Sequence, residues 1–123
     1  MDFLRKKNDQ CRLYKFAFHY SPVGICLISH PDFEILEINR SFTENVCNGA
    51  DVKGKLFSSV WEKTKERDIM MTGIVRNGVF GWERLKLKGP DDSGRVYLVH
   101  GVMFDDSYIM ISAKIPEGAN PLQ

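Results

Sequence analysis

The stretch ILEINRSFTENV, residues 35–46, changes its hydrophobic periodicity at one asparagine. Residues 35–38 have the apolar character of a strand, whereas Phe42 and Val46 lie four residues apart, which is the spacing of one helix face. An asparagine side chain accepts hydrogen bonds from the free N–H groups of a first helical turn, so Asn39 is predicted to cap a short helix that reaches Val46. Loss of such a cap costs about 1 kcal/mol. The sequence therefore predicts a strand that passes into a helix without a loop.

The other elements are predicted from the same two periodicities and from the turn residues between them. They are, in chain order, a helix at 9–20, strands at 23–29 and 34–38, short helical pieces within 40–62, a helix at 63–77, and strands at 79–89, 95–104 and 107–115. Strands at both ends, joined to their chain neighbours by hairpins, predict one five-stranded antiparallel sheet. The expected fold is α+β, with short helices on one face of this sheet and a flanking N-terminal helix.

Two apolar faces are expected to point into the core of this fold. In the helix at 63–77, one face combines Ile69, Met70, Gly73 and Ile74. In the last strand, alternation places four residues on one side of the sheet: Ile109, Ile111, Ala113 and Ile115.

Length and composition describe one ordinary domain. The chain has 123 residues and a net charge of +1, so charge gives no reason to expect a nucleic acid or an anionic membrane as a partner. No run approaches the ~20 apolar residues of a membrane span. We expect a cytoplasmic protein with a flexible N-terminus at 1–8, a domain at 9–115 and a tail at 116–123.

The cysteines, histidines and aspartates form no pattern typical of a metal or catalytic site. Cys11, Cys26 and Cys47 contain no C-x-x-C pair, so they are expected to be reduced and mostly buried. The aspartate pairs at 91–92 and 105–106 fall in predicted turns, where backbone geometry favours them. The motifs G-x-S-x-G, Walker A and H-E-x-x-H are absent. We therefore predict no metal site, no catalytic residues and no enzymatic activity.

The order and spacing of three segments resemble the PAS domain family of sensory modules in bacterial and archaeal signalling proteins. They are SPVGICLIS, FEILEINRSFTEN and NGVFGWERLKLKGPDDSGRVYLVHGVMF, and the resemblance covers about residues 10–115. It implies a sensor that detects a small ligand or partner and regulates an effector through dimerisation. In this family the effector is commonly a histidine kinase, a diguanylate cyclase or a transcription regulator. The tail at 116–123 would lead to an effector or linker that is not in this chain.

The resemblance also implies a small cavity between the sheet and the helix at 63–77. Seven apolar side chains are predicted to line it: Phe42, Ile69, Met70, Ile74, Leu85, Val99 and Ile111. Trp82 and His100 are further candidates for ligand contacts. The alternative is that these side chains fill the core, because apolar faces at helical and strand spacing are expected in any such fold.

Haem and flavin are the two cofactors that the resemblance raises, and no cofactor is the leading expectation. Haem-binding relatives supply a histidine from the helix before the third strand, and residues 63–77 contain none. His100 would approach a haem only if its strand turned the even-numbered residues inward. Cys47 lacks the flanking residues of the NCRFLQ-like motif of flavin photoreceptors. Trp82 occupies the place of a tryptophan found in some flavin-binding relatives, but alternation puts it opposite Leu85 unless a bulge intervenes.

The predicted N-terminal helix is apolar over more than one stripe. Its large side chains are Leu13, Tyr14, Phe16, Phe18 and Tyr20. One stripe can cover the sheet, and another then needs a second partner. We expect a homodimer that uses this helix and the outer face of the sheet. A ligand-free protein-interaction module remains the alternative to a ligand sensor.

Overall fold

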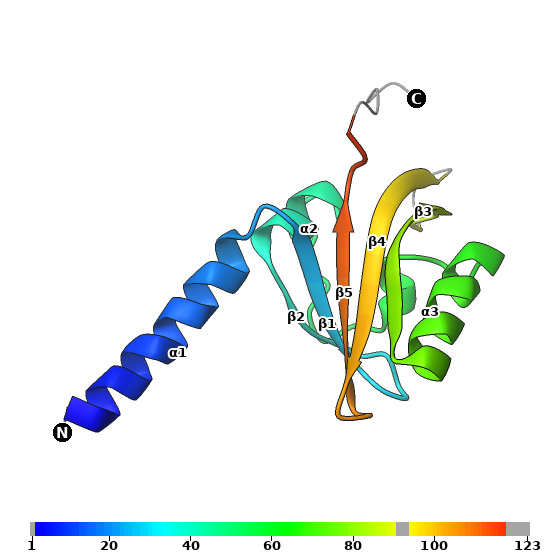
Figure 1. Ribbon diagram of the computed structural model, residues 1–123. Helices are drawn as coiled ribbons and strands as arrows, with labels where there is room; N and C mark the ends of the chain where they lie inside the picture. Colours follow the sequence, from blue (N-terminus) through cyan, green and yellow to red (C-terminus); the bar gives the residue numbers. More distant parts are fainter. Residues whose placement is uncertain (1, 91–93, 118–123) are drawn as a thin grey trace.

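In a computed structural model of the chain, five antiparallel strands form one sheet in the order β2-β1-β5-β4-β3 (Figure 1). The structure describes residues 2–90 and 94–117. The elements are α1 (Asp2–Tyr20), β1 (Gly24–Ser29), β2 (Ile35–Ile38), α2 (Arg40–Asn45), the 3₁₀ turn η1 (Phe57–Ser59), α3 (Lys65–Asn77), β3 (Val79–Leu87), β4 (Arg95–Phe104) and β5 (Tyr108–Lys114). The α+β fold with a five-stranded antiparallel sheet is confirmed. The predicted turn at 91–92 and the end of the tail, 118–123, lie outside the described residues.

The first helix differs most from its prediction. It begins at Asp2, within the segment expected to be flexible, and not at Asp9. Figure 1 shows α1 projecting away from the sheet, so that neither of its apolar stripes covers a sheet face. Its C-terminal end alone lies near the body of the domain, beside α2.

Alternation along the strands separates an inner sheet face, covered by α2, η1 and α3, from an outer face. Cys26 of β1, Val99 of β4 and Ile111 of β5 are fully buried on the inner face. Ile109 and Ala113 are also buried as predicted, whereas Ile115 is exposed because β5 ends at Lys114. The inner face and its helices form one hydrophobic core.

Capping residues at both ends define α3. Thr64 accepts a hydrogen bond from Arg67 N, and Gly78 ends the helix in the left-handed conformation with φ of 79°. The buried side of α3 carries Met70, Met71 and Ile74. Ile69 is 49% exposed, so the prediction that it faces inward was wrong.

Asn39 joins the strand β2 to the helix α2 and also holds two other segments. It is fully buried, and its Oδ1 accepts hydrogen bonds from Phe42 N at 3.0 Å and Ile25 N at 2.9 Å. Its Nδ2 donates to Phe18 O and Val23 O, both at 2.9 Å. The predicted cap is confirmed, but Asn39 satisfies three more backbone groups than a cap requires.

Helix α3 approaches the sheet closely at one glycine of β4. A Cβ atom at Gly101 would lie 2.2 Å from Ile74 Cδ1 and 2.7 Å from Ile74 Cγ1. Because Ile74 is fully buried, its side chain has no free space into which to move. Gly101 therefore sets the distance between α3 and the sheet.

We predict that Asn39→Ala lowers the free energy of unfolding by about 3 kcal/mol or more, because buried backbone groups at the junction lose their partners. The matched control is Thr64→Ala, which removes an ordinary helix cap and should cost about 1 kcal/mol. Urea denaturation of both variants measures the difference. Equal costs for the two caps would show that the additional bonds of Asn39 contribute little.

We also predict that Gly101→Ala destabilises the protein by about 1–3 kcal/mol through overpacking against Ile74. Gly81→Ala is the control, because a Cβ atom there would meet no heavy atom within 4 Å. Adding Ile74→Val to Gly101→Ala removes one clashing methyl group and should restore part of the loss. Thermal denaturation reports all three variants, and a double variant no more stable than Gly101→Ala would contradict this account.

Candidate functional site

Five of the seven predicted pocket residues come together on the inner face of the sheet. Fully buried in one core cluster are Phe42, Met70, Ile74, Val99 and Ile111. Leu85 is partly buried and packs against this cluster. Ile69 points away from it, on the exposed side of α3.

Aromatic side chains that the sequence analysis did not select complete this cluster. The ring of Trp61 lies 5.9 Å from Phe42, 5.6 Å from Phe57 and 5.4 Å from Tyr97, measured between centroids. Such tilted and edge-to-face pairs are favourable aromatic geometries. Trp61 lies two residues beyond the end of η1, where the chain has no periodic pattern that would have indicated its burial.

Trp82 and His100 lie together on the outer face of the sheet. Their ring centroids are 5.3 Å apart, and Lys114 Nζ lies 4.9 Å from the Trp82 ring. The register of β3 and β4 shifts between Phe80 and Glu83, as in a β-bulge. This irregularity turns Phe80 toward the core and leaves Trp82 outside. His100 therefore points away from the predicted pocket.

The cysteine thiols of the core are poorly suited to covalent chemistry. Burial, with a smaller contribution from Cys47, raises the pKa of Cys26 far above its ordinary value. Burial also raises the pKa of Cys47 to about 11. Both thiols therefore stay protonated at neutral pH, and the thiol is a weak nucleophile compared with the thiolate. Cys11 is exposed on α1, so the prediction of burial was wrong for this residue.

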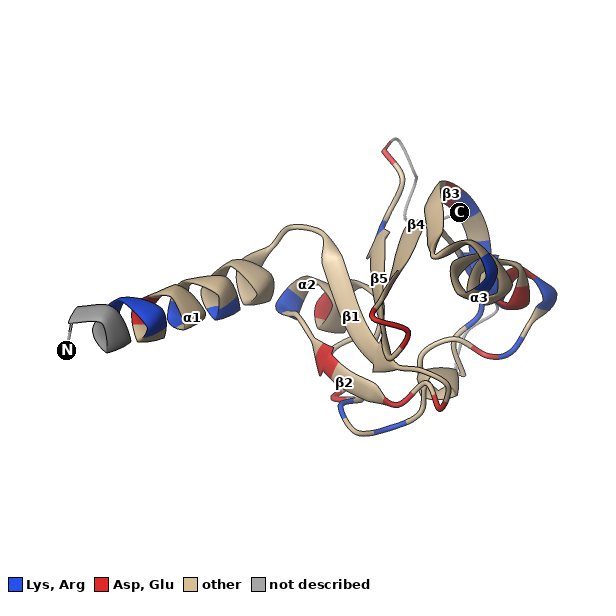
Figure 2. Ribbon diagram, turned by 60° about the horizontal axis from the view of Figure 1, so that its bottom comes forward, with Lys and Arg blue, Asp and Glu red and all other residues tan. Residues whose placement is uncertain are grey.

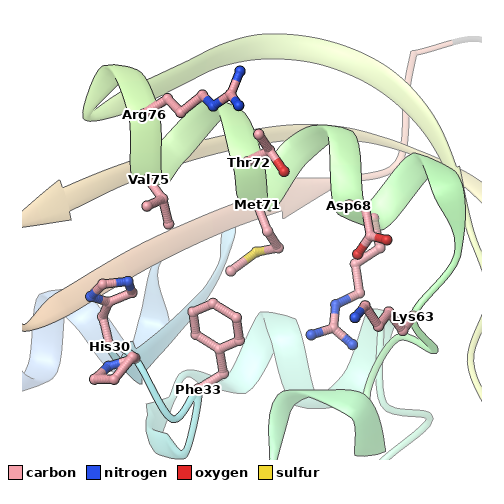
Figure 3. A pocket seen from close by; sticks show the side chains of 10 residues that line it. His30, Phe33, Lys63, Asp68, Met71, Thr72, Val75 and Arg76 are labelled. Carbon is pink, nitrogen blue, oxygen red and sulfur yellow. The ribbon is translucent and has the colours of Figure 1, made fainter.

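A groove separates α3 from the turn between β1 and β2 (Figure 3). Its volume is about 550 Å³. Figure 3 shows Met71 and Val75 of α3 pointing toward His30 and Phe33 of the turn. Charged side chains join these residues in lining the groove, namely Lys63, Arg67, Asp68 and Arg76.

Arg67 is the unusual member of this groove because it is an arginine on the buried side of α3. It is 7% exposed, and its Nη1 donates a hydrogen bond to Trp61 O at 3.1 Å. Its guanidinium group lies 5.3 Å from the centroid of the Phe57 ring. Sequence reasoning missed Arg67, since an arginine at such a position ordinarily extends into water.

The outer face of the sheet and α1 expose large apolar side chains that no other part of the described chain covers. Strands β1, β4 and β5 contain no charged residues apart from Arg95 and Lys114 at two strand ends, as Figure 2 shows. Exposed on this face are Val79, Trp82, Val96, Phe104 and Tyr108. On α1 the exposed fractions are 65% for Leu13, 71% for Tyr14, 62% for Phe16 and 54% for Tyr20.

Neither a cluster of metal-binding side chains nor a membrane-spanning helix is found among the described residues, 2–90 and 94–117. No group of three or more histidine, cysteine, aspartate or glutamate side chains is placed to hold a metal ion in this part of the chain. Within the same residues, no helix has the length and apolar character needed to cross a membrane.

Comparisons by sequence identify no relative of this chain. No protein-family model matches it, and no curated protein matches it significantly.

Comparison with solved structures gives close matches of fold. The PAS domain of an HTR-like protein from Haloarcula marismortui matches 92% of this chain and 97% of its own, with 18% identity and a TM-score of 0.65. A domain of the sensory box sensor histidine kinase/response regulator from Geobacter sulfurreducens matches 85% of this chain and 93% of its own, with 15% identity and a TM-score of 0.62. The PAS domain of nitrogen regulation protein NR(II) from Vibrio parahaemolyticus matches 85% of this chain and 98% of its own, with 8% identity and a TM-score of 0.58. The chain therefore has the fold of a PAS domain.

Proposed function

We propose that this chain is a non-enzymatic sensory domain that forms a homodimer and regulates an effector through it. The observation that carries the proposal is the pair of apolar surfaces, on α1 and on the outer sheet face, that the rest of the described chain leaves uncovered. The similar structures include a domain of a sensor histidine kinase and a PAS domain of a regulatory protein. A domain of this fold with two such surfaces is suited to passing a signal between chains.

The side chains of α1 support a second copy of this chain as the partner. Phe16 and Tyr20 lie one helical turn apart, and their ring centroids are 4.9 Å apart. Large aromatic side chains are enriched where protein interfaces are buried. A helix of 19 residues with such a surface is stabilised when another helix or a sheet face covers it.

The outer sheet face offers the complementary surface. Phe104 and Tyr108 stack at the end of the β4–β5 hairpin with centroids 6.4 Å apart, and Phe104 is 68% exposed. Trp82 adds a large ring on the edge strand β3. Exposed large apolar side chains of this kind are a feature of interaction surfaces in soluble domains.

The packing of the core supports the proposal that the protein acts without a bound chromophore. Trp61, Phe42 and Tyr97 pack on one another over the inner sheet face. His100 faces the opposite side of the sheet, and the raised pKa of Cys47 disfavours a flavin–thiol adduct.

The purified protein is expected to be colourless. An absorption spectrum tests this, because bound flavin absorbs near ~450 nm and bound haem near ~400 nm. Either band, at a cofactor content close to one per chain, would contradict the proposal in its present form and favour a redox or gas sensor.

The homodimer is tested by light scattering and sedimentation over a range of protein concentrations. We predict that Phe16→Glu raises the dimer dissociation constant by about tenfold or more, because it places a charge in an aromatic contact. Ile69→Glu is the matched control, since Ile69 is also an exposed apolar residue of a helix but lies outside both proposed surfaces. A strict monomer at high concentration, or equal effects of the two substitutions, would rule out this interface.

A further inference from the structure

The groove between α3 and the β1–β2 turn contains a buried cation that lacks an acidic partner. None of the ion pairs among the described residues includes Arg67. Its Nε is buried and has no hydrogen-bond partner in this part of the chain. Desolvation lowers the pKa of Arg67, and the neighbouring Asp68 carboxylate offsets only part of that effect. A buried charge in this state is costly for the folded protein.

The surroundings of Arg67 make the groove favourable for an anion at one end. Lys63 also lines this end, so two cations lie there with the single carboxylate of Asp68, and Arg76 adds a third cation at the other end of the groove (Figure 3). Figure 3 places Lys63 and Asp68 close together at the end of the groove near the start of α3. Arg67 belongs to the first turn of α3, where the helix dipole adds to the positive potential.

Apolar side chains form both walls beyond this end, where His30, Thr72 and Arg76 also line the groove. Met71 and Val75 form one wall, and Phe33 forms the facing wall (Figure 3). Val75 is 42% exposed, so this wall is open to solvent. Ligand grooves commonly combine such apolar walls with a small number of polar groups that fix orientation.

We propose that this groove binds a small organic anion whose carboxylate lies at Arg67 and Lys63 and whose apolar body lies against Phe33, Met71 and Val75. The inference depends on the sensory function proposed above, for which it names a site and a chemical class of ligand. An arginine presents a planar set of donors that matches a carboxylate, and Nη1 of Arg67 is already held by Trp61 O. The fixed guanidinium therefore has donors left for the ligand and a fixed orientation in which to offer them.

The direct test is a titration of the protein with hexanoate, followed by amide NMR spectra. Hexanol is the matched neutral probe and inorganic phosphate is the probe without an apolar body. We expect saturable shifts at amides of α3 and of residues 30, 32 and 33 with hexanoate, and affinities at least about tenfold lower for the other two probes. The spectra also separate this site from unspecific binding, which would shift amides of α1 or of the outer sheet face.

Substitutions then test which positively charged side chains bind the carboxylate. Arg67→Met keeps an unbranched apolar side chain on Phe57 and should weaken hexanoate binding by about tenfold or more. Lys63→Gln changes an exposed residue, so it keeps the test valid even where Arg67→Met fails to fold, and it should weaken binding severalfold. Lys65→Gln is the control, because Lys65 lies on the same helix but does not line the groove.

Three outcomes would overturn the inference. They are equal affinities for hexanoate and hexanol, equal affinities for hexanoate and phosphate, and unchanged affinity for hexanoate in the Lys63→Gln variant. Light scattering on the same samples distinguishes the failure of one proposal from the failure of the other. A protein that forms a homodimer but binds no hexanoate would contradict the proposed ligand site and leave the dimer proposal intact.

Discussion

The four side-chain hydrogen bonds of Asn39 are the interaction on which the arrangement of this domain depends. They hold β1 against the start of α2, and they also hold Val23, the last residue of the link between α1 and β1. Every one of these bonds is to a backbone group, so other side chains could change around them without altering the geometry. A residue in this place must donate two hydrogen bonds and accept two, and it must be short enough to remain buried. Asparagine is the smallest side chain that meets these requirements.

The periodicity of the chain was sufficient to predict the sheet, because a strand with one buried face must alternate. Ile109, Ile111 and Ala113 are buried as the alternation required. The same reasoning was less successful for α3, since its apolar residues occur on both sides of the helix. Ile69 and Met70 are adjacent, and helical spacing alone does not determine which of them faces the sheet. The close approach of Ile74 to Gly101 makes that choice, and it depends on a contact between residues far apart in the sequence.

The candidate sites were predicted less well than the fold, for two physical reasons. The aromatic cluster around Trp61 is assembled from a short 3₁₀ turn, a helix and a strand, and it has no local pattern. Arg67 is a charged residue in the interior, whereas charged residues usually lie at the surface. Residue type alone therefore predicts that Arg67 is exposed to solvent. Such departures from local rules are expected where a protein serves function in addition to stability. Five of the seven predicted pocket residues lie together in the core, but the unusual chemistry lies at Arg67, which lines the groove beside α3.

Contacts at the C-terminal end of α1 link the surface proposed on this helix to the strand–helix junction in the core. Asn39 Nδ2 donates to Phe18 O, and Arg40 lies 6.0 Å from the Tyr20 ring, so adjacent residues of the strand–helix junction contact the end of α1. In addition, Ser41 Oγ donates to Pro22 O in the link that follows the helix. A displacement of α2 or of β1 would therefore change the direction in which α1 leaves the domain. Because α1 extends far from the sheet (Figure 1), a small rotation at this junction moves its N-terminal end by a larger distance. A dimer formed through α1 would thus be sensitive to the packing around one buried asparagine.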